Sequence, residues 1–161
     1  MDNKQFKQAC LKKVTSDHQS GSAEIALVAL QALADYSQRS VLADPAAYQK
    51  DLTAFATELQ QTRPSMAILV NIIDAWREEI NQNINSSLNT LKQVALIKAN
   101  ELITQSSQAN NHIVQHVCSL VADNSVVLTH SISSTVTSCF IELAKKNISA
   151  IITESKIGRA S

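Results

Sequence analysis

The spacing of apolar residues predicts a chain that is helical over most of its length. Between residues 25 and 36 they recur at i, i+3, i+4, i+7, i+8 and i+11, and other apolar residues begin a second stripe on the same helix. We therefore expect this helix to be buried on two sides. The first stripe is Ile25, Val28, Ala29, Ala32, Leu33 and Tyr36, and the second begins with Leu27, Leu30 and Ala34.

Similar patterns predict helices before and after this one. Residues 4–14 form a short amphipathic helix, and Asp44-Pro45 begins another, because Asp can cap a helix whose first residue is Pro. We expect Pro64 to begin the next helix. Residues 85–121 contain no Gly or Pro and predict one long helix, with an interruption near residues 106–111 left open.

The pattern changes after Asp123-Asn124. The run Ser125–Thr129 is short and β-branched, residues 136–146 return to helical spacing, and residues 148–153 are again apolar. A strand, a helix and a strand in this order predict a right-handed parallel βαβ unit. The hydroxyl-rich turn after the first strand has two readings: a phosphate site at the N-terminus of the helix, or N-capping by Ser133 or Ser134 without a ligand.

Composition and charge restrict the classes of function that we expect for this chain. The 161 residues allow one domain, or one and a fraction, and 14 Lys and Arg balance 14 Asp and Glu. We therefore expect no direct binding of nucleic acid or of a membrane surface, and a protein or a small molecule as partner. Since aromatic residues make up only 4% of the chain, its core should be aliphatic and rich in alanine.

The cysteines and histidines indicate no metal or disulfide chemistry. Cys10, Cys118 and Cys139 are widely spaced, which argues for reduced thiols rather than for a disulfide framework or a zinc site. His112 and His116 are four residues apart on a helix, but no third ligand lies nearby. The amino terminus has no apolar signal segment and no stretch is long enough to span a membrane, so we expect a cytoplasmic protein without cofactors.

Three groups of residues together resemble the amino-terminal half of the translation initiation factor 2B alpha/beta/delta family. Relatives in that family include methylthioribose-1-phosphate isomerase and ribose-1,5-bisphosphate isomerase. The matching segments occur in the family's order and cover essentially the whole chain: Ser20-Gly21-Ser22-Ala23-Glu24, Thr62-Arg63-Pro64-Ser65-Met66-Ala67, and Leu128-Thr129-His130-Ser131 with Thr153-Glu154-Ser155-Lys156 beyond it.

The resemblance implies a mainly α fold, with a helical domain over residues 1–121 followed by the first βαβ unit of an incomplete Rossmann-like domain over residues 122–161. It also implies a phosphate-containing ligand at the junction of the two domains. Arg63 would pair with that phosphate or with a carboxylate that holds two helices together, and His130 would donate to the phosphate or serve as a structural histidine. The expected ligand-binding residues are Ser20, Gly21, Arg63, His130, Ser131, Ser133 and Ser134.

Two departures from the isomerase pattern favour a regulatory role over catalysis. Ser131 occupies the position of the isomerase cysteine, and a hydroxyl is a much poorer acid or nucleophile near neutral pH. Ser20-Gly21 replaces the Arg-Gly pair that contacts phosphate in those enzymes. We therefore expect a regulatory or assembly protein without catalytic residues, whose partners are homologous subunits and a phosphorylated small molecule. The alternatives are an aldose-phosphate isomerase of the same family and an inactive truncated fragment.

Overall fold

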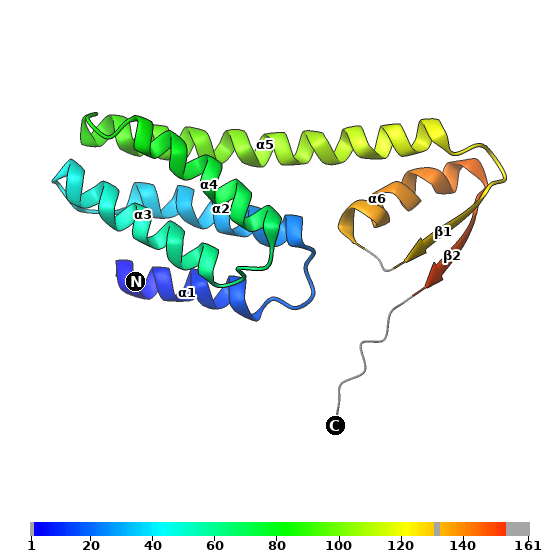
Figure 1. Ribbon diagram of the computed structural model, residues 1–161, viewed down its shortest axis with the longest axis horizontal. Coiled ribbons are helices and arrows are strands. Elements are labelled where there is room, and N and C mark those ends of the chain that lie inside the picture. The colour runs from blue at the N-terminus through cyan, green and yellow to red at the C-terminus, as the bar shows by residue number, and fades with distance from the viewer. Residues whose placement is uncertain (1, 131–132, 154–161) are drawn as a thin grey trace, which may run out of the picture. The chain divides into compact units, whose positions relative to one another are not determined.

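The structure, a computed structural model, describes residues 2–130 and 133–153 and divides into two compact units, Met1–Ser106 and Ser107–Ser161 (Figure 1). The elements in chain order are α1 (Asn3–Ser16), α2 (Ser22–Arg39), α3 (Pro45–Gln61), α4 (Ala67–Gln82), α5 (Leu88–Leu120), β1 (Val126–His130), α6 (Ser134–Leu143), the 3₁₀ helix η1 (Ala144–Lys146) and β2 (Ser149–Thr153). The expected fold class, mainly helical with a terminal βαβ unit, is confirmed.

The helix α2 is the centre of the first unit. It contacts α1, α3 and α4, and its two apolar stripes both face inward. Ala29, Leu30, Leu33 and Ala34 are fully buried although they point to different sides of the helix. The expectation of a helix buried on two sides is therefore confirmed. Small alanine side chains let neighbouring helices approach closely, which is how a core with few aromatic residues still packs densely.

The helix starts follow local capping chemistry, with one correction. Asp44 Oδ2 accepts a 2.7 Å hydrogen bond from the Ala47 amide, and Pro45 is the first residue of α3, as predicted. The prediction that Pro64 begins the next helix is wrong, because α4 begins at Ala67. Pro64 instead follows the first residue of a turn that the Met66 amide closes on the Arg63 carbonyl at 3.0 Å. Its fixed φ suits that turn position as well as it suits a helix start.

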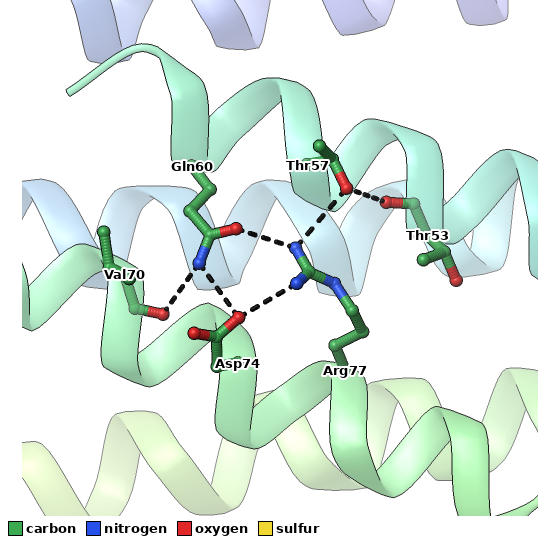
Figure 2. Close-up of polar contacts among 6 residues, drawn as sticks. All are labelled: Thr53, Thr57, Gln60, Val70, Asp74 and Arg77. Atoms are coloured by element: carbon green, nitrogen blue, oxygen red, sulfur yellow. Dashed lines mark hydrogen bonds and ion pairs between the residues drawn. The ribbon is translucent and has the colours of Figure 1, made fainter. Parts of the chain in front are cut away.

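A polar network fastens α3 to α4 (Figure 2). Arg77 donates from Nη2 to Gln60 Oε1 at 2.9 Å and from Nη1 to Asp74 Oδ1 at 2.9 Å. Gln60 Nε2 donates to the same Asp74 oxygen at 2.9 Å and to the Val70 carbonyl at 3.2 Å. The side chain of Arg77 is only 22% exposed and joins the two helices.

The helix α5 is continuous from Leu88 to Leu120, so the interruption left open near residues 106–111 does not occur. Within the first unit, its residues Leu91, Ala95 and Ala99 complete the core. The buried Trp76 donates from Nε1 to the Ala95 carbonyl at 2.9 Å. This hydrogen bond satisfies the one polar atom of the largest core side chain.

In the second unit β1 and β2 pair in parallel, with Leu128 opposite Ile151. On the face of β1 that carries Val126 and Leu128, these side chains are 66% and 67% exposed, and Ile151 of β2 is 49% exposed. The crossover helix α6 begins at Ser134, two residues earlier than expected, because Ser133 caps it. Cys139 of α6 is buried, and this burial raises the pKa of its thiol.

Hydrogen bonds around the end of α5 hold the second unit together. Lys146 Nζ donates to the carbonyls of Cys118 at 2.6 Å and Val121 at 2.9 Å. Asn124 and Asn147 both have left-handed backbone conformations, and Asn147 Nδ2 donates to Asn124 Oδ1 at 2.9 Å. Asn tolerates this conformation better than most residues, which explains the turns at these two points.

None of the helices in the described part of the chain has the length and apolar character needed to cross a membrane.

Candidate functional site

Arg63 binds the end of α1. Its Nε donates to the Val14 carbonyl at 3.0 Å, and its Nη2 donates to the carbonyls of Thr15, at 3.0 Å, and Asp17. The last carbonyls of a helix have no partner within the helix, and the negative end of the helix dipole favours a cation there. Arg63 thus forms a C-cap on three backbone carbonyls rather than an ion pair with a carboxylate, and its contact with a phosphate stays a prediction.

Asp17 links Arg63 to the Ser20-Gly21 pair. Its Oδ1 accepts hydrogen bonds from the amides of Ser20, at 2.8 Å, and Gln19, at 3.0 Å. These bonds, that of Ser20 first, hold the pKa of the Asp17 carboxyl below its usual value. Asp17 was not among the residues predicted from the sequence. The signal was present, because an Asp just after a helix often binds the amides two and three residues on.

The N-terminus of α2 follows directly. Gly21 precedes the helix and has no side chain to cap it, and its own amide donates to Glu24 Oε2 at 3.2 Å. The first-turn amides of a helix are natural donors for an anion, although the Glu24 carboxylate opposes a second negative charge here. The structure therefore brings Ser20, Gly21 and Arg63 into one neighbourhood through Asp17. Their role in phosphate binding stays a prediction.

The other expected site residues lie in the second unit. His130, at the end of β1, places Nδ1 2.9 Å from Thr153 Oγ1 at the end of β2. Ser133 Oγ accepts from the Val136 amide at 3.2 Å, and Ser134, the first residue of α6, accepts from Ser138 Oγ through its carbonyl at 3.0 Å. Ser131 lies outside the described residues.

These contacts match the ligand-free reading of the turn, in which Ser133 caps the helix and His130 has a structural partner. They do not test the phosphate reading, because the remaining first-turn amides of α6 are still available to an anion. Within residues 2–130 and 133–153, no three His, Cys, Asp or Glu side chains gather in a way that could hold a metal ion.

A second titratable cluster in the first unit was also missed from sequence. The buried Tyr36 hydroxyl donates to Asp51 Oδ2 at 2.5 Å, and Lys7 Nζ lies 2.7 Å from Asp51 Oδ1 and 4.7 Å from the centre of the Tyr36 ring. Burial, with the hydrogen bond to Asp51, raises the pKa of Tyr36. The cluster joins α1, α2 and α3, so its evident effect is to hold α1 on the bundle.

Comparison with known proteins gives the family. A sequence model of the Initiation factor 2 subunit family matches residues 18–156. Ribose 1,5-bisphosphate isomerase of Haloferax volcanii is 28% identical over 139 residues, which are 84% of this chain and 42% of the relative. The chain thus spans less than half the length of this curated relative.

Two solved structures have the same fold. The tetrameric eIF2B-beta2-delta2 complex from C. thermophilum matches with a TM-score of 0.81 and 16% identity, over 98% of this chain and 52% of that one. The 5-methylthioribose 1-phosphate isomerase of Pyrococcus horikoshii OT3 matches with a TM-score of 0.78 and 13% identity, over 91% and 51%. Taken with the match over residues 18–156, the helical bundle followed by a parallel βαβ unit shows that this chain belongs to the Initiation factor 2 subunit family.

Proposed function

We propose that the chain is a non-catalytic member of its family that acts by assembling with homologous subunits. The observation that carries this proposal is the uncovered face of the β1–β2 pair, on which Val126, Leu128 and Ile151 are each about half or more exposed. Parallel strands rich in Val and Ile are normally covered on both faces. An apolar face of this kind supports a role in which further α/β structure packs against it.

Three features support a binding role over catalysis. Ser131 stands where the isomerases that the chain resembles carry a cysteine, and a serine hydroxyl needs an activating base near neutral pH. The guanidinium of Arg63 is engaged by backbone carbonyls of α1. Ser133 Oγ is engaged as an N-cap. The contacts of Arg63 and Ser133 are thus contacts that hold the fold in place.

The first test is a direct assay for isomerase activity. The purified chain is incubated with ribose 1,5-bisphosphate, with the Haloferax volcanii relative as the positive control, and product is followed by ³¹P NMR. We expect no turnover by the chain under conditions in which the control converts the substrate. Turnover that disappears in the Ser131→Ala variant would refute the non-catalytic role.

The second test addresses assembly. Sedimentation velocity over a range of concentrations should show association of the chain, and the double variant Leu128→Lys with Ile151→Lys should shift the population toward monomer. The matched control is Ile97→Lys with Ile113→Lys, which places the same charges on exposed apolar positions of α5. A chain that is monomeric at all concentrations would contradict the proposed role of the sheet.

Isomerisation of a sugar phosphate is the second candidate. The specific observation in its favour is the alignment with ribose 1,5-bisphosphate isomerase over 139 residues at 28% identity. Under this alternative the chain would supply part of an active site, since it spans 42% of that relative. Complementation distinguishes the two: addition of a separately expressed carboxy-terminal half of the relative would generate activity only if the chain contributes catalytic groups.

We further propose that a phosphorylated small molecule binds the amide groups at the helix N-termini described above. The expected contacts are Ser20, Gly21 and Arg63 in the first unit, and His130, Ser131, Ser133 and Ser134 in the second. Support comes from the missing side-chain cap at α2 and the small hydroxyl residues at α6. Titration with ribose 1,5-bisphosphate should shift the backbone amide NMR signals of Ser22 and Ala23 or those of Ser134 and Thr135. If neither pair of signals moves, this proposal is refuted.

A further inference from the structure

The first unit contains an apolar groove that the proposed function does not use. It has a volume of about 330 Å³ and runs between α1 and α2, with Ile103 of α5 at its side. Phe6, Cys10 and Lys13 line it from α1, since residues four and seven positions apart share one helix face. Opposite them lie Leu27, Val28, Gln31, Ala32 and Asp35 of α2. The volume is at the lower end of the range of small-molecule sites, roughly 300–1,000 Å³.

The floor of the groove is uncharged. Phe6, Leu27, Val28 and Ile103 are partly buried and pack against the main core, so they present apolar surface without filling the space. Burial raises the pKa of the Cys10 thiol, which therefore stays protonated near neutral pH. An apolar group bound in the groove therefore contacts carbon atoms and an uncharged sulfur atom.

The edge of the groove carries one positive and one negative side chain. Asp35, whose Oδ1 accepts from Gln31 Nε2 at 2.9 Å, is the one carboxylate among the lining residues, and Lys13 is the one ammonium. A second cation lies close by, because the Arg39 guanidinium is 4.8 Å from the centre of the Phe6 ring. Among the described residues Lys13 has neither an ion pair nor a hydrogen bond. Lys13 therefore offers an ammonium without an ion pair to an anionic group at this edge.

We propose that this groove binds a small amphipathic carboxylate, with its apolar body on Phe6, Leu27, Val28 and Ile103 and its carboxylate paired with Lys13. Burial of the apolar body provides the main driving force, because each methylene removed from water contributes favourably. Because the ion pair with Lys13 is exposed, it contributes little to the affinity of the ligand. Its main effect is to favour an anionic ligand over a neutral one. The groove lies wholly in the first unit, so the proposal does not depend on catalysis or on assembly through the β1–β2 pair.

Cys10 provides a direct reporter for the test. Octanoate, kept below the concentration at which it forms micelles, is titrated into the full chain, and the rate of alkylation of each cysteine by iodoacetamide is measured by peptide mass spectrometry. We expect octanoate to protect Cys10 in a saturable manner. Cys118, which is likewise intermediate in exposure but lies in the second unit, is the internal control and should react at an unchanged rate.

Two comparisons test the role of charge. Octanamide has the same apolar body without the negative charge and should protect Cys10 more weakly. The variant Lys13→Ala should raise the half-protecting concentration of octanoate roughly two- to fivefold, the range expected for one exposed ion pair. Its matched control is Lys12→Ala, which removes an exposed neighbouring lysine that does not line the groove and should change nothing.

Four results would overturn the proposal. The first is the absence of Cys10 protection at millimolar octanoate. The second is equal protection by octanamide, and the third is equal protection of Cys118, which would indicate non-specific binding of an amphiphile. The fourth is protection of Cys10 that rises with protein concentration in the absence of octanoate, since a second copy of the chain would then cover the groove. The comparison of octanoate with octanamide uses the unmodified chain, so it remains decisive if a variant fails to fold.

Discussion

The two units bury their apolar residues to very different degrees. In the helical unit, Leu30, Leu33 and Leu52 have no exposed surface, whereas Val126 and Leu128 on β1 are 66% and 67% exposed. A helix needs to bury only one apolar stripe, so it can form a closed core with four neighbouring helices. A pair of parallel strands has two faces and two edges that must be covered. The helical unit therefore has the buried core of a stable domain, whereas the βαβ unit leaves much of its apolar surface exposed.

The sharpest test of this difference is a pair of matched truncations. Leu33 and Leu143 are 0% and 1% exposed and lie in different units. We expect Leu33→Ala to lower the free energy of unfolding of the helical unit by roughly 2–5 kcal/mol. Leu143→Ala should leave that transition unchanged, in denaturant unfolding followed by circular dichroism.

The variant Ile72→Ala provides an intermediate reference for the same unfolding experiment. Ile72 packs against the core but keeps some exposure, so its truncation should cost less than that of Leu33. If Leu143→Ala shifted the main transition as far as Leu33→Ala, the two units would unfold together and would not differ in stability.

Alkaline pH gives a second test, since both tyrosines of the chain, Tyr36 and Tyr48, lie in the helical unit. Burial raises the pKa of Tyr48 to about 12, and its hydroxyl donates to the Ser37 carbonyl at 3.0 Å. Because the folded state holds this proton more tightly than the unfolded chain, the stabilisation is complete below pH 10 and is lost as pH rises toward 12. The expected loss is roughly 2–3 kcal/mol.

The control for the pH experiment is Tyr48→Phe. This variant lacks the titrating hydroxyl, so its stability should fall less steeply between pH 10 and 12, although lysine deprotonation still contributes in both proteins. Parallel pH profiles for the two proteins would mean that Tyr48 does not titrate in this range.

The third test uses Arg63 and separates its structural role at the end of α1 from a role in ligand binding. Arg63→Ala removes three hydrogen bonds to the end of α1 and should destabilise the helical unit by roughly 1.5–3 kcal/mol, the value for bonds to a charged group. Arg63→Lys keeps the charge but cannot reach three carbonyls at once, so it should recover only part of the loss. Thermal unfolding without phosphate ligands measures both, and an unchanged midpoint for Arg63→Ala would leave the ligand role as its main one.

The smallest expected effect is in the second unit. Ser133→Ala removes the N-cap of α6 and should cost about 1 kcal/mol of local helix stability. Ser134→Ala is the matched control, because Ser134 accepts the hydrogen bond from Ser138 Oγ through its backbone carbonyl and not through its hydroxyl. Amide hydrogen exchange of residues 136–138 measures both, and equal exchange rates in the two variants would argue against the cap.

Local chemistry made much of this fold predictable. Asp44-Pro45 and Ser133 both act at their helix starts because capping depends on only a few neighbouring residues. Pro64 was misread for the same reason, since a turn and a helix start share one backbone angle and the local sequence does not distinguish them. The βαβ order followed from local signals, namely the turn at Asp123-Asn124, the β-branched run after it and the helical spacing of residues 136–146.

The contacts of the candidate site were less predictable because they depend on tertiary structure. Arg63 reaches carbonyls 46 to 49 residues away in sequence, and Arg77 reaches Gln60 only when α3 and α4 pair. Nothing in the local pattern distinguishes an arginine that caps a distant helix from one that binds a phosphate. Asp17 is the exception, since its turn is local and was open to prediction.

The contact between Lys146 and the end of α5 has a consequence for how the second unit opens. Lys146 Nζ binds the carbonyls of Cys118 and Val121, and the Lys146 carbonyl accepts from the Asn124 amide at 3.1 Å. The last turn of α5 and the segment leading into β2 therefore lose their hydrogen bonds together. In native-state hydrogen exchange they should behave as a single foldon, with one opening free energy shared by residues 118–124 and 146–149.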